Sequence, residues 1–322
     1  MKLTRALLLI ILPALALGAG GCFTGVESTP RIRQTDVQRQ QAAGVTSEQL
    51  FLSDIKPVAP AQWNPGRQWL VTNDRISLIF TPASDNTSNL KGHRIFFENV
   101  KGATSLTGDD AGEITFRSDD GRRLYYRVPG LTQERVDTLT SLDIPFAVDL
   151  DLVSRINDVM AGKRLYVRTP SWYDHATRSA VNGLRHIEVT VDSVVPGDEN
   201  FPAAVCFSIA DSNLAKSAGV ADKEYMLYMT AGMTRGGSRS FDTLFAFDNP
   251  RNRYPEIQDD VWEYIIRSRI RKNMTRDECR LALGSPPSVE RVPTYGGMVE
   301  RWSYTDGVYL IFEDGYLTRF RQ

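Results

Sequence analysis

The chain has 322 residues, 42% of them hydrophobic and 24% charged, which is ordinary for globular protein and leaves room for two or three domains. Its formal net charge is −1. Binding to nucleic acid depends on a large summed positive charge, so the composition predicts no nucleic-acid partner.

The first 21 residues have the three parts of a secretory signal. A basic start, MKLTR, precedes an apolar run of about 12 residues, and small residues then lead to Cys22. A hydrocarbon core about 30 Å thick needs about 20 apolar residues, and Pro13 lies inside this shorter run. The segment therefore predicts a cleaved signal peptide, residues 1–21, and no uncleaved transmembrane anchor.

The stretch Leu17-Gly18-Ala19-Gly20-Gly21-Cys22 resembles the lipobox of bacterial lipoproteins. The resemblance implies that Cys22 becomes the first residue and carries acyl chains such as palmitate, each buried CH₂ contributing about 0.8 kcal/mol to membrane binding. Phe23 follows, where an aspartate would resemble an inner-membrane retention signal. We therefore expect an outer-membrane anchor and a chain that faces the periplasm. Cleavage after Ala16, which would leave a soluble periplasmic protein, is the alternative.

Residues 22–48 are polar and Gln-rich, with few large apolar side chains. Such a segment buries too little surface to offset the entropy of ordering, so we expect a flexible tether.

A first β-rich domain is expected over residues 49–148. Short runs of β-branched and aromatic residues predict strands, and Asp120-Gly121 predicts a tight turn between the last two. One helical segment follows, which starts at Thr132 and ends with 149–162, where Gly162 is in a cap-like position. The predicted strands are 76–80, 93–100, 112–118 and 122–128.

A second β-rich domain, residues 149–254, is a candidate repeat of the first. Three segments find an echo in it: 66–74 in 162–170, 91–100 in 182–191, and 114–118 in 205–209. Units of roughly 90 residues with about five short strands resemble SH3-like barrels, a likeness of fold that says little about function.

The C-terminal module, residues 255–322, starts with a helix over 259–271 that ends where Asn273 takes a left-handed conformation. Thr275 and Glu278 form a capping box that starts a second helix, and Gly284 ends it. Cys279 lies on the apolar face of that helix. We therefore expect a buried thiol with a raised pKa, not a nucleophile.

Two cysteines follow Cys22. Cys206 lies in an apolar strand-like run, AAVCFSI. An oxidising compartment permits a disulfide between Cys206 and Cys279, and two buried free thiols are the alternative.

Three strands, 299–304, 307–313 and 315–320, complete the module as an ααβββ unit of two layers. Its motif resembles the SmpA/OmlA family, the BamE-like domains of outer-membrane lipoproteins, over about 65 residues. The motif is Met274-Thr275, Cys279, Leu283-Gly284-x-Pro286, Trp302-x-Tyr304, and Tyr309-x-x-Phe312-x-x-Gly315-x-Leu317. The resemblance implies a protein-docking module of envelope assemblies without known chemistry.

Motifs for catalysis, cofactors or metals are missing from the sequence. The chain has three histidines, His93, His175 and His186, and no HExxH, paired Cys/His or GxSxG pattern. We therefore predict no catalytic, cofactor or metal residues. Trp172, Tyr173 and His175 lie in an expected loop that is a candidate contact for a partner or glycan, or else packs over the end of a barrel.

These observations predict a non-catalytic envelope lipoprotein that docks other envelope proteins through its BamE-like domain. The alternative is a cell-wall protein that binds peptidoglycan through SH3-like domains.

Overall fold

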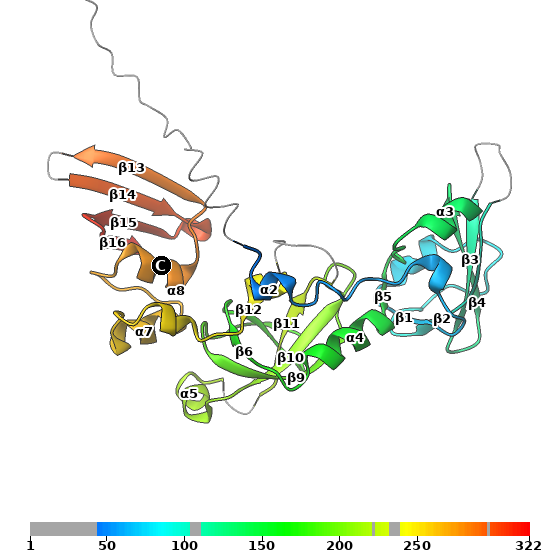
Figure 1. Cartoon of the computed structure of the whole chain (residues 1–322), viewed down its shortest axis with the longest axis horizontal. Helices are drawn as coiled ribbons and strands as arrows, with labels where there is room; N and C mark the ends of the chain where they lie inside the picture. The colour runs from blue at the N-terminus through cyan, green and yellow to red at the C-terminus, as the bar shows by residue number, and fades with distance from the viewer. Residues whose placement is uncertain (1–43, 104–110, 221–222, 232–238, 295–296) are drawn as a thin grey trace, which may run out of the picture. The chain divides into compact units, whose positions relative to one another are not determined.

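The computed structural model describes residues 44–103, 111–220, 223–231, 239–294 and 297–322. These residues form three open antiparallel sheets and a few short helices. The predicted α+β, strand-rich class is confirmed (Figure 1). Cys22 and most of the predicted tether lie outside the described residues. The expected end of the tether at residue 48 is wrong, because Ser47–Leu50 form α2, started by a capping box of Thr46 and Gln49.

The first sheet has five strands in the order β4-β3-β2-β1-β5. The predicted turn at Asp120-Gly121 is confirmed, and Gly121 takes a φ of 91° that favours glycine. Buried aromatic and aliphatic side chains from this sheet form a core of their own. The strands are β1 (Gln68–Val71), β2 (Arg94–Lys101), β3 (Ala111–Ser118), β4 (Arg123–Pro129) and β5 (Ala147–Asp149).

The strand expected at 76–80 is wrong. Asp74–Leu78 form a 3₁₀ helix, and the side chain of Asn73 accepts from the N–H of Arg75 at its start. Phe80 makes only an isolated bridge to Tyr126. A short apolar run does not distinguish a strand from a helix, because its few buried positions fit both the strand period of two residues and the helical period.

The single helical segment expected from Thr132 to Gly162 is wrong, because β5 separates two shorter helices. α3 (Gln133–Thr138) is capped by the Thr132 hydroxyl, which accepts from the N–H of Arg135. α4 (Leu150–Met160) is capped by Asp149 and precedes Gly162, whose φ is 76°.

The second sheet has seven strands in the order β12-β6-β9-β10-β11-β7-β8. Two short helices, α5 (Ser212–Ser217) and α6 (Phe241–Leu244), lie in its connections. The strands are β6 (Arg164–Val167), β7 (Ser171–Asp174), β8 (Ala180–Asn182), β9 (Glu188–Pro196), β10 (Ala203–Ile209), β11 (Tyr225–Met229) and β12 (Phe245–Ala246).

The two sheets share a five-strand pattern, because β11-β10-β9-β6-β12 follows the same order as β4-β3-β2-β1-β5. The N–H of Gly66 donates to Phe97 O at 2.8 Å, and the N–H of Gly162 donates to Val191 O at 2.8 Å. Phe97 therefore corresponds to Val191 in the structure. The sequence echo instead matches Phe97 with Glu188, three residues earlier. The strand order and register agree with a repeat, but the echo of 91–100 in 182–191 has the wrong offset.

A bulge occurs at the same place in both sheets. In the first sheet, Glu98 is skipped where Phe97 pairs with Phe116. In the second, Asp192 is skipped where Val191 pairs with Phe207. Because bulges bend a strand at a defined position, their agreement supports the equivalence of β2 with β9 and of β3 with β10.

The segment that precedes the first sheet packs on the second sheet. We call residues 45–56 the strap. The Phe51 ring lies 4.4 Å from that of Phe241 and 5.1 Å from that of Phe247, measured between centroids. Glu48 is buried, with an oxygen 3.9 Å from the Arg168 guanidinium. An aromatic cluster and a buried carboxylate thus attach the strap.

The C-terminal module contains two helices on one side of a four-stranded sheet, β13-β14-β15-β16 (Figure 1). The first helix is shorter than predicted, but Asn273 has the expected left-handed φ, 68°. The elements are α7 (Asp259–Ile266), α8 (Arg276–Leu283), β13 (Ser288–Thr294), β14 (Gly297–Ser303), β15 (Tyr309–Glu313) and β16 (Tyr316–Arg321).

The expected ααβββ order is therefore wrong by one strand, β13, which pairs with β14 along its whole length. Pro293 in this run argues against a central strand. β13 lies at the edge of its sheet, with β14 as its one strand partner among the residues that the structure describes, and a proline is tolerated at an edge.

Candidate functional site

Cys279 lies on the buried face of α8, as the sequence predicts. Its side chain is fully buried, and burial raises the pKa of the thiol to about 12. The capping box is confirmed, since the Thr275 hydroxyl accepts from the N–H of Glu278 and the Glu278 carboxylate accepts from that of Thr275. Cys206 is also buried and free, so the two thiols do not form a disulfide.

A buried carboxylate, Glu300, lies on the helix side of the C-terminal sheet. The indole N–H of Trp302 donates to it at 2.5 Å, and Arg291 donates to it at 3.2 Å. The Arg276 Nε atom lies 3.3 Å from a carboxylate oxygen of Glu300, where it forms an ion pair but no hydrogen bond. Burial alone would raise the pKa of Glu300, but these partners hold it below its ordinary value. Glu300 therefore stays ionised and fixes the indole.

Apolar side chains remain exposed beside this cluster. Val289 pairs directly with Trp302, and Met298 is four residues before it on β14, so both lie on the helix side of the sheet. Their side chains are 39% and 42% exposed. We call Val289 and Met298 the β13–β14 strip, which the two helices of the module leave uncovered.

The C-terminal module contacts the second sheet through a loop that precedes β9. The N–H of Arg185 donates to Ile266 O, at the end of α7, at 2.8 Å. The His186 ring nitrogen Nε2 lies 3.0 Å from Leu281 O, in the last turn of α8. Burial lowers the pKa of His186 to about 4, so the imidazole is neutral and donates this hydrogen bond. The loop thus supplies donors to the carbonyl ends of both helices.

The predicted contact residues do not form an exposed loop. Ser171–Asp174 form β7, and Trp172 is fully buried, with its indole N–H donating to Thr169 O at 2.8 Å. Trp172 is therefore a core residue. Tyr173 lies half-buried on the sheet, 4.9 Å from the Tyr228 ring, and His175 lies 3.2 Å from Glu224.

One group of side chains in the described part of the chain could hold a metal ion: His93, Asp119 and Asp120, whose ligand atoms lie within 4.8 Å of one another. Asp119 already accepts from the His93 ring at 2.6 Å, and Asp120 is paired with Arg122 at 2.6 Å. The three side chains are 36–40% exposed. These groups satisfy one another on the surface, so we assign no metal site to them.

No family model, curated protein or solved structure matches this chain. Among the described residues, no helix has the length and hydropathy needed to span a bilayer.

Proposed function

We propose that the chain is a non-catalytic docking protein of the bacterial envelope, anchored to the outer membrane through a lipid on Cys22 and facing the periplasm. Its C-terminal module is the part that binds other envelope proteins. The capping box that Thr275 starts and the buried Trp302 involve residues of the motif on which the BamE-like resemblance is based, and they support this proposal.

The observation that carries the proposal is the β13–β14 strip. Apolar side chains on the covered side of a small sheet normally pack under its helices, and those left exposed favour contact with another protein. Val289 and Met298 lie next to Trp302 and Glu300, whose burial and hydrogen bonds hold the surrounding surface rigid.

The test is recovery of partners from cross-linked envelopes with the tagged full-length chain. Val289→Glu combined with Met298→Glu should abolish recovery of partners that the wild type captures, because each substitution places a charge in the contact. Val159→Glu is the matched control, since Val159 is 38% exposed on α4, outside the module. Equal recovery with all three chains contradicts the proposal.

The anchor has a separate test. Cys22→Ser removes the acyl chains, and we expect the chain to move from the membrane fraction to the soluble periplasmic fraction. Continued membrane fractionation would refute lipidation as the cause of anchoring.

Peptidoglycan binding is the second candidate. The order β4-β3-β2-β1-β5, in which a fifth strand returns to pair with the first, supports an SH3-like interpretation of both β-rich domains. Sedimentation with purified sacculi tests it. Stoichiometric recovery on sacculi, with no protein captured in the cross-linking experiment, favours this candidate over docking.

A further inference from the structure

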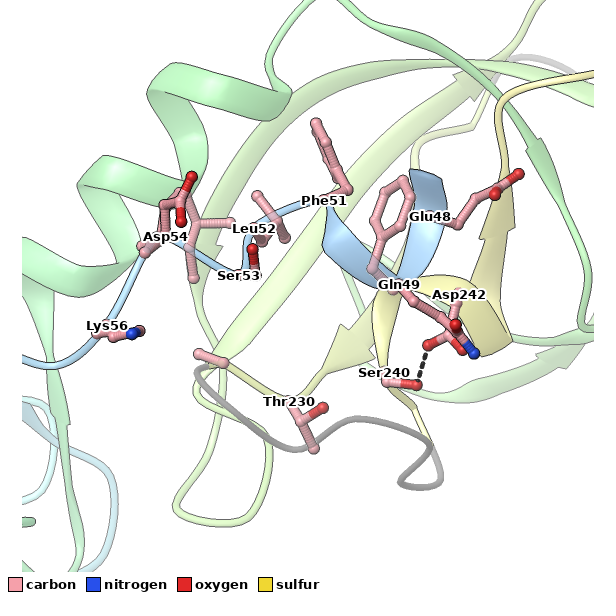
Figure 2. Close-up of a pocket in the computed structure, with 14 residues that line it drawn as sticks. Glu48, Gln49, Phe51, Leu52, Ser53, Asp54, Lys56, Thr230, Ser240 and Asp242 are labelled. Atoms are coloured by element: carbon pink, nitrogen blue, oxygen red, sulfur yellow. Dashed lines mark hydrogen bonds between the residues drawn. The ribbon is translucent and has the colours of Figure 1, made fainter. Parts of the chain in front are cut away.

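A cavity of about 370 Å³ lies between the strap and the second sheet. The strap forms one wall, from Glu48 to Lys56, and the opposite wall combines Ile156 of α4 with the chain at the end of β11 and the start of α6 (Figure 2). Such a volume is near the lower end of binding pockets, which run from about 300 to 1,000 Å³.

The floor of the cavity is apolar. Phe51, Leu52 and Ile55 contribute from the strap, and Ile156 and Phe241 contribute from the second β-rich domain. Ile156 and Phe241 are 1% and 5% exposed, so the floor is part of the core and keeps its shape. The rings of Phe51 and Phe241 pack on each other, which leaves little aromatic face for a sugar to stack on.

Hydroxyl groups and the Asp242 carboxylate, which a hydrogen bond orients, lie on the polar side of the cavity. Ser53, Thr230 and Ser240 border the cavity. Ser240 is 6% exposed, and its hydroxyl donates to a carboxylate oxygen of Asp242 at 2.5 Å. A buried donor therefore fixes the Asp242 carboxylate. The Thr230 hydroxyl donates to Arg239 O at 3.2 Å, so Ser53 supplies the hydroxyl that is open to the backbone groups of a ligand.

Opposite charges lie at the two ends. Figure 2 shows Lys56 on one side of the cavity and Asp242 on the other, with Ser53 and Thr230 between them. Asp242 lies in the field of Arg168, whose guanidinium donates to the backbone O of Asp242 at 2.8 Å. Glu48 faces Arg168. Asp54 and Lys56 are both exposed, so solvent weakens the charge of each.

We propose that this cavity binds a short extended peptide with a cationic group for Asp242, a carboxylate for Lys56 and an apolar side chain between them. The Ser53 hydroxyl donates to the peptide backbone, and the floor buries the central side chain. A lipid chain would cover the Ser53 hydroxyl and the Asp242 carboxylate without giving either a hydrogen-bond partner, which is costly.

The probes are the N-acetylated, C-amidated tripeptides Lys-Leu-Glu, Glu-Leu-Lys and Gln-Leu-Gln, titrated into the full-length chain in mild detergent. One of the two charged orders should bind about three- to tenfold more tightly than the neutral peptide, as expected for two partly exposed charge contacts. Asp242→Asn and Lys56→Gln should each remove most of that advantage. Combined Asp242→Lys and Lys56→Glu should transfer the preference to the other charged order.

Asp158→Asn and Lys101→Gln are matched controls, because both side chains are exposed and lie outside the cavity. They should bind the probes as the wild type does. Equal binding of all three peptides, equal loss in the controls, or a preference that the charge exchange leaves unchanged would each overturn the proposal. None of these results bears on the β13–β14 strip, so docking by the C-terminal module is tested separately.

Discussion

Cys279 lies where a hydroxyl would be costly. The side chain is fully buried on α8, and no hydrogen-bond acceptor is recorded for its sulfur among the described residues. Cys279→Ser should lower the free energy of unfolding by about 1–3 kcal/mol, because the serine hydroxyl loses its water without gaining a partner. Denaturant unfolding checks this, with Cys279→Ala as the control. A serine variant as stable as the alanine variant would contradict the burial argument.

Gly183 is held against the Trp172 ring. A Cβ at this position would lie 2.0 Å from a ring atom, closer than any real contact. Gly183→Ala should therefore destabilise the second β-rich domain by about 1–3 kcal/mol or more, since the indole is fully buried and cannot move aside without strain. Thermal unfolding measures this loss of stability. Gly44→Ala is the control, because a Cβ at Gly44 meets open space and the substitution should be neutral. Gly66→Ala is not suitable as a control, because Gly66 has a positive φ.

His186 links stability to pH. Burial holds its folded pKa near 4, against an ordinary value of 6.5, and Arg185 and Arg168 act in the same direction. The unfolded chain thus takes up a proton that the folded chain resists. The contribution of His186 to stability is full above pH 6.5 and is lost as the pH falls toward 4, by about 2–3 kcal/mol.

The substitution His186→Asn should flatten that part of the pH profile, and asparagine tolerates the φ of 54° found there. Urea unfolding at pH 7 and pH 4.5 measures it. His93→Asn is the control, because the His93 side chain is 36% exposed. Identical profiles for wild type and His186→Asn would show that another group carries the acid sensitivity.

At the scale of elements, Phe51 supplies the aromatic part of the attachment of the strap. Phe51→Ala removes the contacts with Phe241 and Phe247, and should expose residues 45–56 to hydrogen exchange and proteolysis while leaving the sheets folded. Leu50→Ala is the matched control, since Leu50, the last residue of α2 and the neighbour of Phe51, is 49% exposed. Equal protection of the strap in the two variants would mean that its polar contacts, through Glu48 and Lys56 O, hold it without Phe51.

Local signals predicted local structure well. The capping box at Thr275 and the turn at Asp120-Gly121 each depend on a few neighbouring residues, and both are found where the sequence places them. The strand expected at 76–80 and the loop expected at 172–174 are wrong, because short segments take their conformation from what packs on them. The contact of Phe51 with Phe241, and the cavity behind it, join parts of the chain that no spacing rule connects.

At the scale of the whole molecule, the described residues form two large apolar cores. One belongs to the first sheet, and the other is continuous from the second sheet into the C-terminal module. Separate cores predict separate unfolding units, so calorimetry should resolve two transitions where a one-core chain would give one.

The shared five-strand pattern supplies matched substitutions for testing this. Phe116 and Phe207 occupy equivalent positions beside the two bulges, and both are fully buried, in different cores. Phe116→Leu and Phe207→Leu should each cost about 1–2 kcal/mol and lower only one transition by several degrees. Cys279→Ser should move the same transition as Phe207→Leu, because both lie in the continuous core. A single transition that all three substitutions lower would mean that the two cores unfold as one unit.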